Sequence, residues 1–139
     1  MKLSSKGRYA VMALTDLAKF DPKIPVSLRD ISLRQGISLV YLEQLFLKLK
    51  KNQIVNSVRG KRGGYILSKK PKEIKISDIF FAVDEKIKTI GCEKHSKQGC
   101  NGRSSKCITH DLWDELGNYI NDFFKKKNLG DLINQTKFN

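Results

Sequence analysis

Residues 27–67 read SLRDISLRQGISLVYLEQLFLKLKKNQIVNSVRGKRGGYIL, and this stretch decides the fold. It opens on Ser27-Leu28-Arg29-Asp30, a capping box that predicts the start of a short helix. Gly36 suits the left-handed end of that helix, and Ser38 is an N-cap for a second helix that runs to about Asn52. Two helices joined by a tight turn with a glycine are typical of a helix-turn-helix, although ordinary helical hairpins share the pattern.

The residues that follow predict a β-hairpin with a basic tip. Residues 54–58 and 65–67 are strand-like, and between them lies Arg59-Gly60-Lys61-Arg62-Gly63-Gly64. A hairpin directly after a helix-turn-helix is a wing. Its glycines let the backbone approach a groove closely, and its cations can meet phosphates or enter the minor groove. A flexible surface hairpin is the alternative interpretation.

Apolar periodicity predicts helices on both sides of this stretch. Residues spaced three and four apart favour helices over about 5–20, 76–84 and 109–127, and a short turn or helix is expected at 129–133. The helix at 109–127 carries an apolar stripe too wide for a small domain to cover. Pairing with the same helix of a second copy would bury it, so we expect a homodimer.

Charge divides the chain into two parts. Residues 1–75 carry 17 basic and 5 acidic side chains, whereas residues 76–139 carry 10 and 9. A basic excess confined to one part favours a nucleic-acid-binding module, although a solvated surface or a lipid-binding patch is the alternative. We therefore expect a mainly α chain with a small β-hairpin. A winged helix-turn-helix DNA-binding domain would occupy 1–75, and a cysteine-containing loop with dimerisation helices would occupy 76–139.

The sequence predicts no membrane segment. No run approaches the roughly 18 apolar residues that a spanning helix requires. The N-terminus lacks the apolar stretch and small-residue cleavage site of a secretory signal. We expect a cytoplasmic protein without a membrane partner.

Cys92, Cys100 and Cys107 lie in one window and are followed by His110. An odd number of cysteines in a reducing compartment argues against a disulfide framework. Thiolates and an imidazole together bind soft or borderline metals. The spacing is not that of a zinc finger, and on these residues alone zinc and an iron–sulfur cluster remain equally open. His95 is the competing fourth ligand.

Several stretches together resemble the IscR-type iron–sulfur cluster regulators, a family of bacterial winged-helix transcription factors. The resemblance covers almost the whole chain. It is carried by MKLSSKGRYAV at 1–11, QGISL at 35–39, YLEQLF at 41–46, SVRG at 57–60, GGY at 63–65, AVDE at 82–85 and THDLW at 109–113. Two features depart from the family. Lys61 and Arg62 replace the middle of its Gly-Pro-Gly-Gly-Gly wing, and the first two cysteine intervals are longer than in its best-known members.

The resemblance implies a 2Fe–2S cluster held by Cys92, Cys100, Cys107 and His110. It thereby favours iron over zinc and His110 over His95. It also implies a dimer whose long helices cross. The branch with a histidine ligand senses cluster supply and regulates cluster assembly genes, so cluster-assembly scaffold proteins are the expected cluster donors.

The expected DNA target is a double-stranded, palindromic operator, because a dimer has twofold symmetry. Base contacts are expected from the N-terminal part of the recognition helix, at Ser38, Tyr41, Glu43 and Gln44. Gln44 can pair with adenine, whereas Glu43 can accept from cytosine and would repel phosphates. Arg59 is expected in the minor groove. The candidates for phosphate contacts are Lys6, Arg8, Lys48, Lys50, Lys51, Lys61 and Arg62.

Two other functions remain open at this stage. One is a winged-helix regulator with structural zinc or thiol-based redox sensing. Another is an RNA-binding or protein-interaction module whose cysteines are incidental. An enzyme with a Cys107–His110 thiol–base pair is disfavoured, because no orienting third residue or oxyanion feature accompanies the pair.

Overall fold

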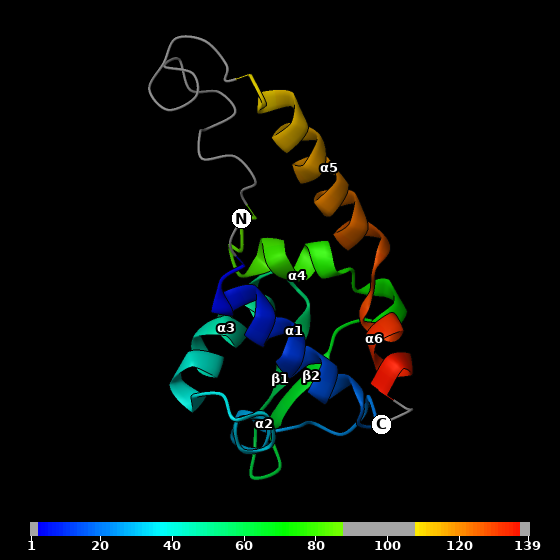
Figure 1. Ribbon diagram of the computed structural model, residues 1–139. Helices are drawn as coiled ribbons and strands as arrows, with labels where there is room; N and C mark the ends of the chain where they lie inside the picture. The colour runs from blue at the N-terminus through cyan, green and yellow to red at the C-terminus, as the bar shows by residue number, and fades with distance from the viewer. Residues whose placement is uncertain (1–2, 88–107, 137–139) are drawn as a thin grey trace.

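A computed structural model describes residues 3–87 and 108–136 of the chain (Figure 1). Cys92, His95, Cys100 and Cys107 lie outside the described residues. The elements run in the order α1 Ser5–Ala18, α2 Leu28–Gln35, α3 Leu39–Lys51, β1 Val55–Val58, β2 Gly64–Leu67, η1 Pro71–Glu73, α4 Ile76–Ala82, α5 His110–Lys126 and α6 Leu129–Thr136. The prediction of a mainly helical fold with one small β-hairpin is confirmed. The short 3-10 helix η1 was not predicted.

The helix-turn-helix begins and ends at the residues that the sequence indicates. The Ser27 hydroxyl accepts a hydrogen bond from the Asp30 amide at 3.1 Å and caps α2. Gly36 ends α2 with φ of 66°, a left-handed conformation that glycine adopts without steric cost. The Ser38 hydroxyl then accepts from the Tyr41 amide at 3.4 Å and caps α3. The tight turn between α2 and α3 is therefore fixed by local side-chain chemistry.

The wing is tied to the start of α2 as well as to itself. β1 and β2 pair in antiparallel register from Val55↔Leu67 to Val58↔Gly64. Val26 forms a further antiparallel bridge with Tyr65, through backbone hydrogen bonds of 2.8 and 3.0 Å. Gly64 allows this approach, because a Cβ there would collide with the Val26 carbonyl. In Figure 1 the loop between β1 and β2 extends beyond α2.

One hydrophobic core joins most of the elements. α1 contributes Ala10, Ala13, Leu14 and Leu17, and it contacts α2, α3, β2, α4 and α6. Ile79 of α4 and Leu129 of α6 belong to the same core. The core therefore continues across residue 75. The predicted boundary at residue 75 separates a basic part of the chain from a nearly neutral part, and the core does not divide there. The assignment of these parts to DNA binding and to dimerisation stays a prediction.

α5 lies apart from this core. Among the described residues, none of its side chains is fully buried, and Figure 1 shows its N-terminal half leaving the helical body. Phe124, near its C-terminal end, packs edge-on against Phe80 of α4 with ring centroids 4.7 Å apart. Its apolar stripe is exposed at Leu112, Trp113, Leu116, Tyr119 and Phe123.

A buried carboxylate fixes α2 against α1. Asp16 is only 4% exposed, and Arg34 donates to it from two nitrogens, the shorter contact being 2.8 Å. The Gln35 side-chain amide donates to Oδ2 of the same carboxylate at 2.7 Å. The Arg34 guanidinium also lies 4.6 Å above the Phe20 ring. The hydrogen bond with Asp16 raises the pKa of Arg34, which favours the charged guanidinium.

Replacement of Arg34 should destabilise the fold by leaving Asp16 buried with only Gln35 as a partner. We expect Arg34→Leu to lower the free energy of unfolding by about 3 kcal/mol, the low end for a broken buried pair, because Arg34 is itself partly exposed. Chemical denaturation measures this value. Asp16→Leu/Arg34→Leu should be less destabilised than Arg34→Leu, and Arg29→Leu on the exposed side of α2 is the control. A loss below about 0.5 kcal/mol in Arg34→Leu would contradict this account of the pair.

Candidate nucleic-acid interface and metal ligands

The outward face of α3 is the candidate surface for reading bases. Leu42, Leu45, Phe46 and Leu49 are buried and hold the other face of the helix in the core. Glu43 and Gln44 are exposed, as predicted for base contacts. Ser38 is exposed too, and its hydroxyl already accepts the capping hydrogen bond. A hydroxyl can accept one hydrogen bond and still donate another, so Ser38 remains available to DNA.

Tyr41 lies on the side of α3 that faces α1. It is half-buried, and its ring packs edge-on against Tyr9 with centroids 5.9 Å apart. Its hydroxyl hydrogen-bonds to the Ser5 hydroxyl at 2.9 Å. Tyr41 therefore positions α3 on α1. Its role as a base reader stays a prediction.

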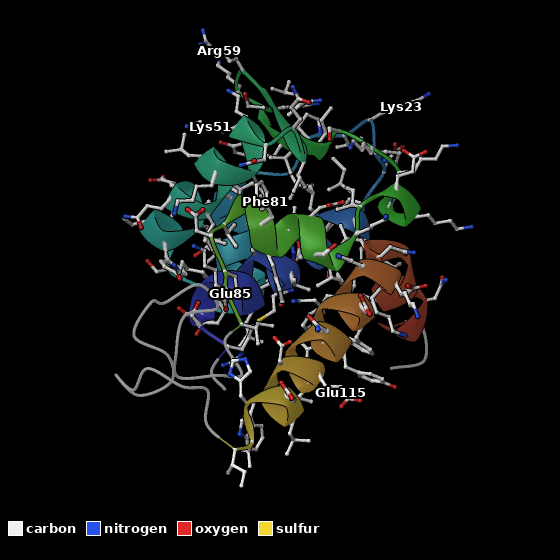
Figure 2. All side chains as sticks on the ribbon, turned by 90° about the horizontal axis from the view of Figure 1, so that it is seen from above. Lys23, Lys51, Arg59, Phe81, Glu85 and Glu115 are labelled. Carbon is white, nitrogen blue, oxygen red and sulfur yellow. The ribbon has the colours of Figure 1, made fainter. Side chains whose placement is uncertain are left out.

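The wing presents its cations away from the helices. Arg59, Lys61 and Arg62 are all exposed, and Figure 2 shows Arg59 at the outer end of the hairpin. Gly60 has φ of 123°, and the Gly63 amide donates to its carbonyl at 3.0 Å, so the tip is a tight turn. Tyr65 packs edge-on against Phe46 at 5.0 Å and joins the base of the wing to α3. This contact ties the base of the wing to the helix that carries the candidate base-reading face.

The predicted phosphate contacts on the helices differ in their surroundings. Arg8, Lys50 and Lys51 are exposed, whereas Lys6 is half-buried at the start of α1. Lys48 forms an ion pair with Asp84 at 3.2 Å. Because both side chains are largely exposed, this pair stabilises the fold only weakly, and a DNA phosphate could compete for Lys48.

Glu85 is a buried residue that the sequence did not single out. It is 9% exposed, and the Ser4 hydroxyl donates to its Oε2 at 2.5 Å. Its Oε1 has no hydrogen-bond partner in the part of the chain that the structure describes. Gly7 packs on the same side chain, since a Cβ there would lie 2.8 Å from Glu85 Cγ. Glu85 therefore ties the end of the segment before the cysteines to the N-terminus of α1.

The predicted metal ligands are only partly within the described residues. His110 is the first residue of α5 and is half-buried. Within 3–87 and 108–136, no group of three or more His, Cys, Asp or Glu side chains could hold a metal ion. Since the three cysteines lie outside these ranges, the predicted ligand set stays a prediction.

A membrane-spanning segment was not expected, and among the described residues no helix combines the length and the apolar character that crossing a membrane requires.

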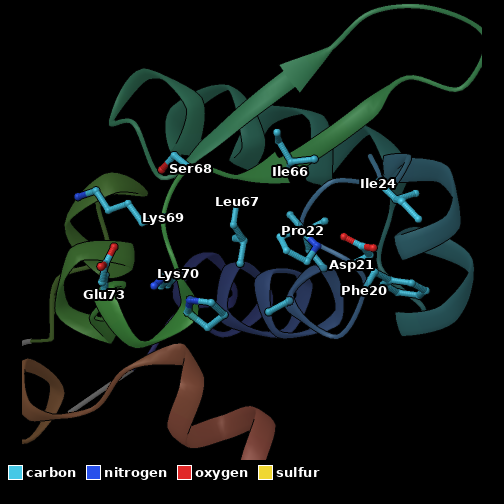
Figure 3. A pocket seen from close by; sticks show the side chains of 13 residues that line it. Phe20, Asp21, Pro22, Ile24, Ile66, Leu67, Ser68, Lys69, Lys70 and Glu73 are labelled. Carbon is cyan, nitrogen blue, oxygen red and sulfur yellow. The ribbon is translucent and has the colours of Figure 1, made fainter.

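A hollow of about 410 Å³ lies between the end of α1, the loop before α2 and strand β2 (Figure 3). Leu17, Phe20 and Leu67 supply part of its apolar wall. Its charged lining residues are all exposed: Asp21, Lys69, Lys70 and Glu73. Without a buried polar group to orient a ligand, this hollow lacks the convergent chemistry of a binding site.

Comparison with known proteins assigns the whole chain to one kind of protein. A family model described as "Rrf2: Iron-dependent Transcriptional regulator" matches residues 3–135. The HTH-type transcriptional regulator IscR of Photorhabdus laumondii is 48% identical over 134 residues, which are 96% of this chain and 80% of that protein. The matched region therefore includes the described helices, the wing and the cysteine segment.

Solved structures agree with this match. The structure of T. potens IscR has a TM-score of 0.77 and 35% identity, and the match covers 98% of this chain and 88% of that one. The structure of CymR, the global cysteine regulator of B. subtilis, has a TM-score of 0.79 and 28% identity, over 97% and 98% of the two chains. These neighbours confirm the winged-helix fold.

Arg59→Ala should weaken DNA binding and change the preference for flanking sequence. Arginine is attracted to the narrow minor groove of A·T tracts, so its loss should reduce the advantage of operators with A·T flanks. Affinities for matched duplexes with A·T and G·C flanks measure this effect, and Lys23→Ala, away from the wing in Figure 2, is the control. Unchanged affinity and flank preference would remove Arg59 from the minor groove.

Proposed function

The chain belongs to the Rrf2 family of transcriptional regulators, and we propose that it senses iron–sulfur cluster status through a bound 2Fe–2S cluster. It is a DNA-binding transcription regulator and not an enzyme. In this proposal it binds palindromic operators as a homodimer in the cytoplasm and controls cluster assembly genes. The observation that carries the DNA-binding role is the packing of the cation-tipped wing on α3, the helix that presents Glu43 and Gln44 to solvent.

Cys92, Cys100, Cys107 and His110 form the proposed ligand set. Three thiolates and one imidazole suit a 2Fe–2S cluster, whose irons accept both sulfur and histidine nitrogen ligands. His110 would link such a cluster to the first turn of α5. When bound, the cluster supplies a redox-active group whose presence reports cluster supply, and scaffold proteins would deliver it. Structural zinc on the same residues is the second candidate, since the donor set suits that ion as well.

The exposed stripe of α5 supports the homodimer. A helix with one apolar face is stable in water only if that face is covered. An apolar hollow of about 470 Å³ lies beside the stripe and is lined by Leu3, Ile87, Tyr119, Ile120, Phe123 and Phe124. A second α5 would cover both the stripe and this hollow, and twofold symmetry would place two copies of α3 on a palindromic operator.

The proposed switch acts through the segment that precedes the cysteines. Asp84 contacts α3 through Lys48, and Glu85 contacts the start of α1 through Ser4. The neighbouring Ser5 holds Tyr41 of α3. A cluster held by the cysteines and by His110 of α5 would link this segment to α5, and it would thereby bias the separation of the two copies of α3 in the dimer. Cluster occupancy would then select among DNA sites.

Removal of one cysteine should abolish both the cluster and its control of DNA binding. Protein purified without oxygen should absorb visible light and contain equal amounts of iron and acid-labile sulfide, and Cys107→Ala should lack all three. Across a set of operators, the site preference of Cys107→Ala should match that of cluster-free wild type. A cysteine variant that binds every operator as the loaded wild type does would refute the switch, and stoichiometric zinc would favour the second candidate.

A charge on the α5 stripe should separate the dimer. Tyr119 is 75% exposed in the single chain, so Tyr119→Glu should leave the monomer folded while it opposes pairing. Analytical ultracentrifugation should give a mass near 15.9 kDa for this variant and about twice that value for wild type. Asn118→Glu, exposed on another side of α5, is the control and should stay dimeric. A dimeric Tyr119→Glu would place the interface elsewhere.

A further inference from the structure

The part of the outward face of α3 that ends at Leu47 is unusual for a DNA-reading surface because it carries apolar side chains and no cation. Val40, Glu43, Gln44 and Leu47 are exposed, and their spacing of three and four residues places them on one side of the helix. Val40 is 63% exposed and Leu47 is 65% exposed. The cations of the helix come later, at Lys48, Lys50 and Lys51. This stripe therefore offers bases two alkyl side chains, Val40 and Leu47, together with the Glu43 carboxylate and the Gln44 amide.

Val40 occupies the first turn of α3, the part of a recognition helix that contacts base edges in a helix-turn-helix protein. The Ser38 cap fixes the backbone of this turn, and Val40 is β-branched, so its side chain has few rotamers. It cannot form a hydrogen bond with a base. Leu47 lies almost two turns further along, where the helix leaves the region of closest base contact.

The major groove offers one apolar group that such a side chain can recognise, the C5-methyl group of thymine. We propose that Val40 is a specificity-determining residue that packs against a thymine methyl group in each operator half-site. The inference rests on the proposed function, since it requires α3 to enter the major groove. It deepens that function by naming the base feature read at this position, beside a Gln44 suited to adenine and a Glu43 suited to cytosine.

The test removes the methyl group from the DNA and the alkyl group from the protein, separately and together. Operators are first selected from random duplexes with the full-length wild type. Each thymine of the selected half-site is then replaced by uracil, which lacks only the methyl group, and affinity is measured for each duplex. Wild type should lose about fourfold in affinity at one thymine position in each half-site, the value of one buried methyl group.

Val40→Ser should bind the thymine and uracil duplexes equally at that position, whereas Val40→Thr, which keeps one methyl group, should retain part of the difference. Leu47→Ser is the matched control, equally exposed on the same face, and should keep the full wild-type difference. The proposal is overturned if Val40→Ser loses as much affinity as wild type when each thymine is replaced by uracil. It is also overturned if Leu47→Ser is the only variant that no longer loses affinity on this replacement, or if the selected half-site contains no thymine. A wild type that selects no sequence would overturn the proposed function itself, so the two failures are distinguishable.

Discussion

The close packing of α1 is the constraint on which the rest of the structure depends. Its buried face is built from small residues, Gly7, Ala10 and Ala13, next to Leu14 and Leu17. Small side chains let neighbouring elements approach the helix axis, and at Gly7 even one methyl group would collide with Glu85 and Phe80. Because α2, α3, α4 and α6 all pack on this one helix, the recognition helix and the residues before the cysteines share a single rigid support.

Under the proposed function, this arrangement lets one small chain combine DNA reading with cofactor sensing. The wing is joined to the segment before α2 by the Val26–Tyr65 bridge and to α3 by the Phe46–Tyr65 contact, so the residues proposed to contact the DNA grooves belong to one packed unit. α5 is the exception, since it leaves the core with its apolar stripe uncovered. Because most of α5 packs outside the core, in the proposed dimer this helix, which carries His110, can pair with its copy while the DNA-reading unit stays intact.

The sequence alone predicted those parts of the structure that interactions between neighbouring residues determine. Capping at Ser27 and Ser38, the left-handed Gly36 and the apolar periodicity all predicted elements that the structure confirms. It was insufficient for contacts between distant residues, since no local pattern links Ser4 with Glu85, 81 positions away. The same limit applies to the packing of Tyr41 against Tyr9 of α1, which no local pattern predicted, whereas the role of Tyr41 in base contact stays a prediction. The predicted cluster ligands rest on a family resemblance, because thiol spacing alone did not separate iron from zinc.

The most direct measurement of the central claim is the affinity ratio between a selected operator and a random duplex of equal length. It should be measured at one ionic strength on the same preparation before and after cluster removal, because phosphate contacts make absolute affinities depend on salt. A sequence-specific regulator controlled by its cluster should show a ratio of about 10³ or more in the loaded state and a changed preference among operators after removal. A ratio near one in both states, or identical preferences, would contradict the account.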